Sequence, residues 1–149
     1  MKLRLLIASV ALLAVGAVAL SAAAKNEKGP DVAQVSQGEK INLADYAVPG
    51  KTTIFDFSSD YCGPCRTYTE PLAKLHAKRS DIAVVRVDIN RPGVRGIDWK
   101  SPVAREFELE SIPHFKVYGP DGKMIAEDTA EAGAPARQMV DKWIAELGQ

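Results

Sequence analysis

The sequence predicts one α/β domain in which a central mixed β-sheet is flanked by helices on both faces. Segments of strand length alternate with segments of helical period along most of the chain, which is typical of parallel pairing through crossover helices. Further on, two strand patterns meet at the turn Gly119-Pro120-Asp121-Gly122, which predicts an antiparallel hairpin. Parallel pairing followed by a hairpin gives a mixed sheet.

The centre of the predicted sheet is a strand at residues 52–57. This run is β-branched and aromatic, and it follows the turn signal Val48-Pro49-Gly50, so we expect it to be buried on both faces. A helix is predicted over residues 62–79, because apolar side chains there recur at helical spacing among basic ones.

The other elements follow from the same patterns. In the last helix, Trp143 lies three residues after Val140 and four before Leu147, which predicts an apolar stripe facing the core. The remaining expected elements, in chain order, are a first strand near residues 40–43, a strand at 82–89, a short helix at 102–108, the hairpin within 114–127 and the last helix at 135–147.

The N-terminus has the pattern of a secretory signal peptide over residues 1–24. A short basic start precedes an uncharged apolar run from Leu5 to Leu20, and Ala22-Ala23-Ala24 offers a cleavage site. The alternative is an uncleaved membrane anchor, because about twenty apolar residues can cross a bilayer. We expect export, most simply to a bacterial periplasm. Residues 25–37 are predicted to form a flexible leader and residues 38–149 the domain.

The charges are balanced, with 19 Lys and Arg against 19 Asp and Glu. No block of like charge favours a nucleic acid or a membrane surface as a partner. Without residues 1–24 the chain is long enough for one core but not for two. We expect a monomeric domain that binds neither nucleic acid nor metal.

The only two cysteines, Cys62 and Cys65, form a C-x-x-C pair. Haem attachment is disfavoured because Arg66 stands where a histidine is needed, and structural zinc because His76 and His114 are distant in sequence. A dithiol that cycles with a disulfide fits a pair placed where a strand becomes a helix. The expected redox group is therefore the Cys62–Cys65 disulfide, without a further cofactor.

Cys62 is the predicted nucleophile of this pair. At a helix N-terminus, unpaired backbone N–H groups and the positive end of the helix dipole favour a thiolate over a thiol. Cys65 lies one turn further in, where we expect it to be less exposed. It is predicted to resolve the mixed disulfide that Cys62 forms with a client.

These residues resemble the thioredoxin family, and the resemblance covers about residues 38–148. The motif matches the family at Gly63 and Pro64 as well as at the cysteines. Asp56 stands where the family keeps a buried carboxylate, so the resemblance implies that it moves the proton of the resolving thiol. From the residues alone, a hydrogen-bonded core carboxylate is the alternative. Ile112-Pro113 resembles the family's segment with a cis-proline facing the dithiol, and the implied fold is that of thioredoxin.

Client binding is expected at Tyr61, Ile112, Pro113, His114 and Trp99. Tyr61 replaces the tryptophan that usually precedes the motif, and a titratable ring at His114 would tune the thiolate. Trp99 lies in residues 91–101, an insertion relative to a short thioredoxin that should emerge at the edge of the sheet that holds the motif. It either supplies an aromatic surface or pins its loop to the body of the domain.

The expected function is reduction of disulfides in client proteins of the cell envelope. Gly63-Pro64 resembles the reducing members of the family more than the oxidases, which often carry Pro-His. A reductant in the envelope needs an electron source, and a membrane thiol-reductant donor is the expected partner. Two alternatives are a disulfide donor or isomerase, and a non-catalytic binding module on the same scaffold.

Overall fold

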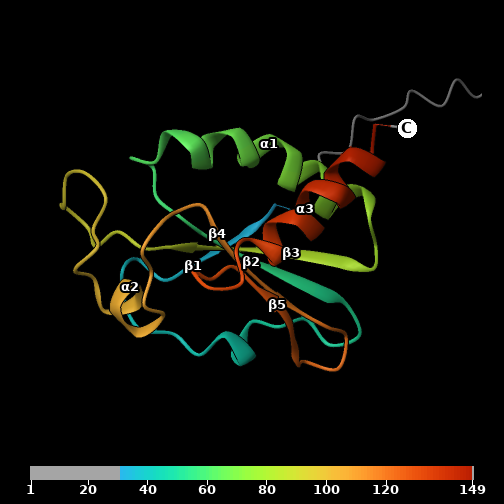
Figure 1. Ribbon diagram of the computed structural model, residues 1–149, viewed down its shortest axis with the longest axis horizontal. Coiled ribbons are helices and arrows are strands. Elements are labelled where there is room, and N and C mark those ends of the chain that lie inside the picture. The colour runs from blue at the N-terminus through green and yellow to red at the C-terminus, as the bar shows by residue number, and fades with distance from the viewer. Residues whose placement is uncertain (1–30, 149) are drawn as a thin grey trace, which may run out of the picture.

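A computed structural model describes residues 31–148 of the protein (Figure 1). The predicted signal peptide or anchor, and residues 25–30 of the predicted leader, lie outside the described residues. Between residues 31 and 148, no helix combines the length and the apolar character needed to cross a membrane.

The described chain folds into the predicted alternation of strands and helices. Its elements, in order, are β1 (Ala33–Val35), the 3₁₀ turn η1 (Leu43–Asp45), β2 (Thr52–Ser58), α1 (Gly63–Lys78), β3 (Ile82–Asp88), α2 (Pro102–Glu106), β4 (His114–Tyr118), β5 (Met124–Glu127) and α3 (Pro135–Glu146).

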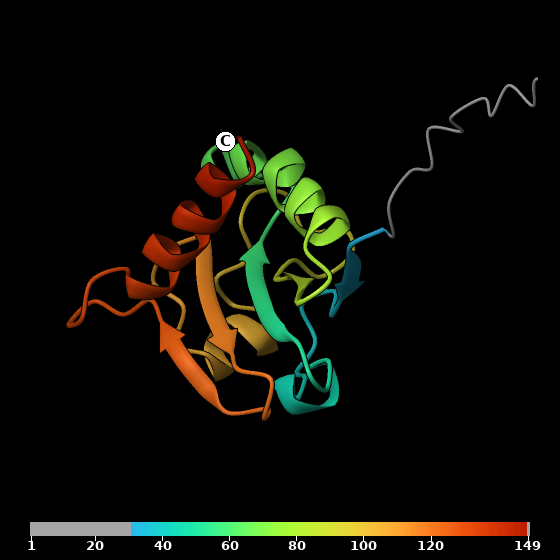
Figure 2. The same ribbon diagram turned by 90° about the vertical axis from the view of Figure 1, so that its right-hand side faces the viewer.

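The five strands form one mixed sheet in the order β1-β3-β2-β4-β5. Strands β1 and β2 both pair with β3 in parallel. Strand β4 pairs antiparallel with β2, and β5 pairs antiparallel with β4 through the predicted hairpin. Helices α1 and α3 cover one face, and α2 and η1 lie on the other (Figure 2). The predicted mixed sheet with helices on both faces is confirmed.

Strand β2 is buried on both faces, as its composition predicts, and its side chains alternate between two cores. Ile54 packs with side chains of α1 and α3, including Leu75 and Val140. Phe55 and Phe57 pack on the opposite face, in the core that includes Val103 of α2. Burial on both sides holds the end of β2, and hence the motif that follows it, in a fixed position.

The prediction of the first strand is wrong. Residues 40–43 form no strand; Leu43 begins η1, and the side chain of Asn42 caps this turn by accepting from the N–H of Ala44. The first strand is instead Ala33–Val35, within the predicted flexible leader. It is a three-residue edge strand whose first two side chains are exposed, so it carries no apolar alternation that a sequence pattern would reveal.

Strands β2 and β3 run parallel, so their C-terminal ends reach the same edge of the sheet. The C-x-x-C motif follows β2, and residues 91–101 follow β3. Both therefore emerge at one end of the molecule, on the left of Figure 1, as expected for this insertion.

Candidate active site

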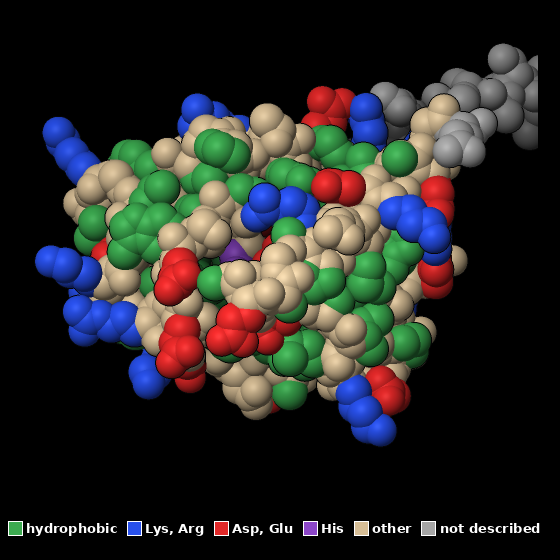
Figure 3. All heavy atoms as spheres, viewed as in Figure 1, with side chains coloured by type: hydrophobic (Ala, Val, Ile, Leu, Met, Phe, Trp, Pro, Cys, Tyr) green, Lys and Arg blue, Asp and Glu red, His purple; other side chains and the backbone are tan. Residues whose placement is uncertain are grey.

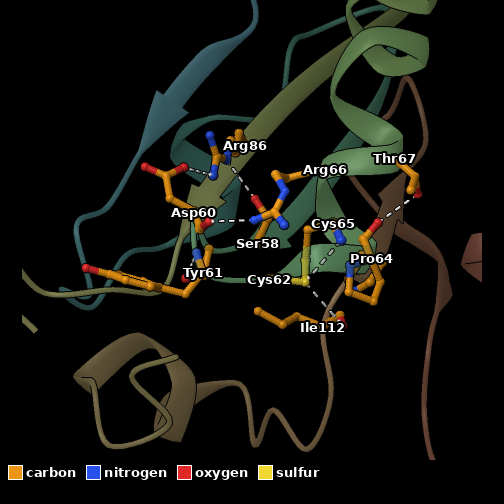
Figure 4. The surroundings of a disulfide bond; sticks show 12 residues. Ser58, Asp60, Tyr61, Cys62, Pro64, Cys65, Arg66, Thr67, Arg86 and Ile112 are labelled. Carbon is orange, nitrogen blue, oxygen red and sulfur yellow. Dashed lines mark hydrogen bonds and ion pairs between the residues drawn. A yellow bond between two sulfur atoms is a disulfide. The ribbon is translucent and has the colours of Figure 1, made fainter. Parts of the chain in front are cut away.

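The C-x-x-C pair lies at the start of α1, and the structure contains the Cys62–Cys65 disulfide (Figure 4). Cys62 is the N-cap residue of the helix, and the backbone N–H of Cys65 donates to the Sγ of Cys62 at 3.1 Å. After reduction, the same N–H would point at a sulfur that carries negative charge. This geometry favours a thiolate at Cys62, in agreement with its predicted role as nucleophile.

The expectation that Cys65 is less exposed than Cys62 is wrong for this disulfide form. Their exposed fractions are 4% and 2%, so burial does not distinguish the two sulfurs. What distinguishes them is position: Cys62 caps the helix, whereas Cys65 lies in its first turn.

The segment predicted to face the motif does so. The Ile112–Pro113 peptide bond is cis, as the family resemblance implies. The carbonyl oxygen of Ile112 lies 3.6 Å from the Sγ of Cys62 (Figure 4). The backbone before Pro113 therefore lies in contact with the sulfur of Cys62.

Asp56 lies behind the motif, buried in β2 with an exposed fraction of 6%. Burial raises the pKa of this carboxyl to about 7, while the positive charge of Arg86 and a hydrogen bond with Ser58 act in the opposite direction. Its Oδ1 has no hydrogen-bond partner among the described residues. Asp56 and Cys65 line the same hollow of about 290 Å³.

Arg86 of β3 is a site residue that the sequence did not reveal. Its Nε donates to the hydroxyl oxygen of Ser58 at 2.8 Å, and its Nη2 donates to the carboxylate of Asp60 at 2.7 Å (Figure 4). Ser58 stands where many thioredoxins have a bulky tryptophan, and this exchange is the only sequence signal that could have pointed to the network. A third, longer hydrogen bond runs from Nη1 to the side-chain oxygen of Gln34 at 3.5 Å, so the guanidinium is held by three partners beside Asp56 rather than paired with it.

Comparisons with known proteins agree with this geometry. The family model described as "Thioredoxin" matches residues 35–146. The chain belongs to the thioredoxin family. Its Cys62–Cys65 pair is the redox-active pair of thioredoxin-family thiol–disulfide oxidoreductases.

Three relatives show how far the similarity extends. The thiol:disulfide interchange protein TxlA homolog of Synechocystis is 31% identical over 81% of this chain and 67% of its own length. A thioredoxin of Coprinus comatus is 30% identical over 64% of this chain and 84% of its own. A thioredoxin H-type of Fagopyrum esculentum is 34% identical over 46% of this chain, and the match spans only 52% of that relative.

Solved thioredoxin structures support the fold. Thioredoxin f from spinach chloroplast has a TM-score of 0.52 at 20% identity, covering 81% of this chain and 97% of its own. The thioredoxin of Trypanosoma brucei brucei has a TM-score of 0.53 at 17% identity, covering 84% and 98%.

Of the residues expected to bind clients, Tyr61 and Trp99 lie at the surface. Their exposed fractions are 51% and 39%. Tyr61 and Asp60 line a hollow of about 280 Å³ together with the start of the 91–101 insertion, Arg91 to Val94. The insertion therefore lies directly beside the motif. Whether Trp99 contacts clients or pins its loop stays a prediction.

His114 does not lie on this exposed rim. Its exposed fraction is 8%, its ring meets the edge of Phe57, and burial lowers its pKa. It lines a separate hollow of about 470 Å³ with Arg137 and Asp128, visible in the middle of Figure 3. Neither cysteine lines that hollow, so the structure gives His114 no direct contact through which to tune the thiolate.

Among residues 31–148, no group of three or more His, Cys, Asp or Glu side chains is placed to hold a metal ion. The site brings together the two sulfurs and a buried carboxyl that lines the same hollow as Cys65.

Proposed function

We propose that the protein is an exported thiol–disulfide oxidoreductase that reduces disulfides in client proteins of the cell envelope. The observation that carries this proposal is the joint placement of Cys62 at the start of α1, Ile112 beside it and Asp56 behind it. The TxlA homolog, which matches most of the described chain, is named for thiol:disulfide interchange, and the proposal assigns that chemistry here.

The first step is attack by the Cys62 thiolate on one sulfur of a client disulfide. The client S–S bond breaks, a mixed disulfide with Cys62 forms, and the first client sulfur leaves as a thiolate that takes a proton from solvent. The N–H of Cys65, already directed at the Cys62 sulfur, stabilises the thiolate before the attack.

The second step is attack by Cys65 on the Cys62 sulfur. The Cys65 thiol first loses its proton to Asp56 through the hollow that both residues line. The mixed disulfide then breaks, the Cys62–Cys65 disulfide forms, and the second client sulfur leaves and is protonated. In total the client gains two electrons and two protons. A carboxyl with a pKa of about 7 suits this role, because near neutral pH it both accepts and releases a proton.

The direction of exchange rests on the residues between the cysteines. Gly63-Pro64 holds no histidine that would stabilise the Cys62 thiolate and make the protein oxidising. Cells would then have to reduce the Cys62–Cys65 disulfide after each turnover. A membrane thiol-reductant donor is the proposed source of electrons.

The envelope location rests on the N-terminal pattern of residues 1–24. Fractionation of cells that express the full chain tests it. The expected result is a periplasmic protein shortened by the mass of those residues. Full-length protein in the membrane fraction would support the anchor alternative, and full-length protein in the cytosol would contradict export.

The equilibrium potential of the Cys62–Cys65 couple, measured against a glutathione redox series, tests the direction. A potential near or below about −250 mV is expected for a reductant. A potential above about −180 mV would contradict it and support a disulfide donor or isomerase. Replacing Cys62 by serine should abolish activity in either case, whereas a non-catalytic binding module would keep its activity.

A further inference from the structure

Residues 91–105, which we call the basic arm, carry more positive than negative charge, unlike the described chain as a whole. They contain four basic residues, Arg91, Arg95, Lys100 and Arg105, and one acidic residue, Asp98. Residues 31–148 as a whole contain fifteen Lys and Arg against eighteen Asp and Glu. The arm is therefore strongly basic on a domain that is otherwise acidic.

Three of these cations are free to meet a partner. Arg91 pairs with Asp98, whereas Arg95, Lys100 and Arg105 are exposed and form no ion pair with any residue between 31 and 148. Lys and Arg side chains gather on the left of Figure 3, over the loop and α2 that lie on the left of Figure 1.

The loop of the basic arm is built from specific hydrogen bonds. Arg91 donates through Nε and Nη2 to the two carboxylate oxygens of Asp98, at 2.7 and 3.0 Å. The amide of Asn90 crosses the loop, donating to the carbonyl of Gly96 at 2.6 Å and accepting from the N–H of Asp98 at 3.2 Å. These contacts fix Arg91 and Gly96, the residues between which Arg95 lies in the loop.

The base of the arm is also packed against the domain. The carbonyl of Gly38 accepts from the N–H of Val103 at 3.1 Å, and Gly38 itself has a φ of +80°. A Cβ at this position would lie 2.5 Å from the Cγ of Arg91, so only glycine allows so close an approach. Because the arm is already ordered, binding of a partner costs little conformational entropy of this loop.

The start of the arm lies beside the motif, and acidic side chains lie near it. Arg91 to Val94 share a hollow with Tyr61 and Asp60, next to Cys62. Within that hollow Asp60 is paired with Arg86, and Asp88 accepts from the N–H of Asn90. Exposed acidic residues follow the arm in the segment that leads to Ile112, namely Glu106, Glu108 and Glu110.

We propose that the basic arm is a docking surface for an acidic segment of the client chain that flanks the disulfide under attack. This proposal rests on the function proposed above and names the kind of client that the site favours. Charge complementarity selects the occupant: a segment rich in Asp and Glu is attracted by the arm, whereas a basic segment is repelled.

The reach of a client chain fits this arrangement. An extended chain advances about 3.3 Å per residue, so acidic side chains three to five residues from the client cysteine lie about 10 to 17 Å from it. A chain bound at Cys62 and running over Tyr61 meets the start of the arm, because Arg91 to Val94 share a hollow with Tyr61. The segment that leads to Ile112 carries Glu106, Glu108 and Glu110, which disfavour an acidic client segment there.

The test uses peptides with one cysteine held in a disulfide to thionitrobenzoate, whose release is followed by absorbance. Three glutamates, glutamines or lysines stand three to five residues before or after the cysteine. At low ionic strength, glutamates on one side should speed reduction about fivefold over glutamines, and lysines there should slow it. This advantage should shrink in 0.5 M salt, because screening weakens attraction between exposed charges.

Charge reversal of the arm provides the matched comparison. In the double variant Arg95→Glu, Lys100→Glu, the lysine peptide should be reduced faster than the glutamate peptide, which reverses the order of their rates. The control Lys78→Glu, Lys142→Glu makes the same change of charge at exposed positions on α1 and α3, with Lys78 at the end of α1 far from the motif, and should preserve the order.

Equal rates for glutamate and lysine peptides, or an equal effect of both double variants, would overturn the docking surface. Binding of the glutamate peptide with serine in place of cysteine separates the two proposals. If no peptide is reduced but this peptide still binds more weakly to the arm variant than to the control, the redox function fails and the docking surface stands. If it binds both variants alike, the docking surface fails.

Discussion

Asp56 and Asp98 are two buried aspartates with an arginine beside each, yet their carboxyls titrate in opposite directions. Their exposed fractions are 6% and 4%. Burial raises the pKa of Asp56 to about 7. Hydrogen bonds from Arg91 lower the pKa of Asp98 below its ordinary value.

The difference lies in what each arginine does. Arg91 donates two hydrogen bonds to Asp98 and so compensates the carboxylate for lost water. Arg86 gives its hydrogen bonds to Ser58, Asp60 and Gln34 and acts on Asp56 through its charge. The two pKa values therefore reflect both depth and hydrogen bonding: burial has the largest effect on Asp56, whereas the hydrogen bonds from Arg91 have the largest effect on Asp98, which is covered but lies close to the surface.

The two carboxyls also have different roles. Asp98 is an ionised anchor that holds the loop of the basic arm in place. Asp56 is kept close to its titration point beside Cys65, at a cost to stability whenever it ionises. The following predictions test this contrast, from the largest expected effect to the smallest.

Replacing Asp56 by asparagine should stabilise the protein at alkaline pH. Between pH 4 and 7 the unfolded chain ionises Asp56 and the folded chain does not, so folding takes up a proton and stability falls as pH rises through this window. Above about pH 7 the full cost of up to about 4 kcal/mol is present, and Asp56→Asn removes it. Urea unfolding at pH 8 measures the gain.

The same variant at pH 4 is the control, because the folded chain then holds the carboxyl proton and the unfolded chain is about half protonated, so most of the gain should vanish. An equal gain at pH 4 and pH 8 would mean that packing, rather than ionisation, distinguishes the two proteins. A loss of stability at pH 8 would contradict the assignment of Asp56 as a carboxyl that is costly to ionise.

Replacing Asp98 by alanine should have the opposite sign. It removes the acceptor of both Arg91 hydrogen bonds and should cost about 2 kcal/mol of unfolding free energy, because bonds to charged groups are worth more than neutral ones. Urea unfolding measures this loss. Asp98→Asn, which keeps one acceptor oxygen, should cost less; an unchanged stability in Asp98→Ala would show that the loop stands without its anchor.

Replacing Asp60 by asparagine should lower the pKa of Asp56, and so bring it closer to the behaviour of Asp98. Without the Asp60 carboxylate, the Arg86 guanidinium is freer to approach Asp56, which should lower the pKa of Asp56 by roughly one unit. Titration of the Asp56 carboxyl by carbon NMR measures this shift. Glu131→Gln, which removes an exposed charge elsewhere, is the control. An Asp56 pKa that stays near 7 in Asp60→Asn would show that Asp60 does not position Arg86.

The smallest effect is expected at the exposed pair of Arg79 and Asp81. Hydrogen bonds from Arg79 lower the pKa of Asp81 to about 2, but 63% of the Asp81 side chain is exposed. Water and salt screen such a pair, so Asp81→Asn should leave the urea midpoint unchanged within error. A loss of stability as large as that of Asp98→Ala would show that the hydrogen bonds to an aspartate, rather than its burial, set its contribution to the free energy of unfolding.

Local patterns predicted the parts of the fold and site that depend on neighbouring residues. The buried strand, the helix with Cys62 at its start and the hairpin each follow from the spacing of apolar and turn residues, and each is present. The resemblance to thioredoxins added the cis bond before Pro113. The first strand was misplaced, because Ala33–Val35 is held by pairing with β3 rather than by an apolar pattern of its own.

The sequence by itself determined the fold class, the redox pair and the presence of a carboxylate in the motif strand, because these depend on residue types and short spacings. Only the tertiary structure decided how that carboxylate titrates. Arg86 comes 28 residues after Ser58 and 26 after Asp60, and it reaches them only because β2 and β3 pair side by side. The sequence placed residues 91–101 at the edge of the sheet that holds the motif, but the structure alone showed that Arg91 to Val94 share a hollow with Tyr61. Electrostatic energy depends on distance in space and on access to water, and both are properties of the folded chain.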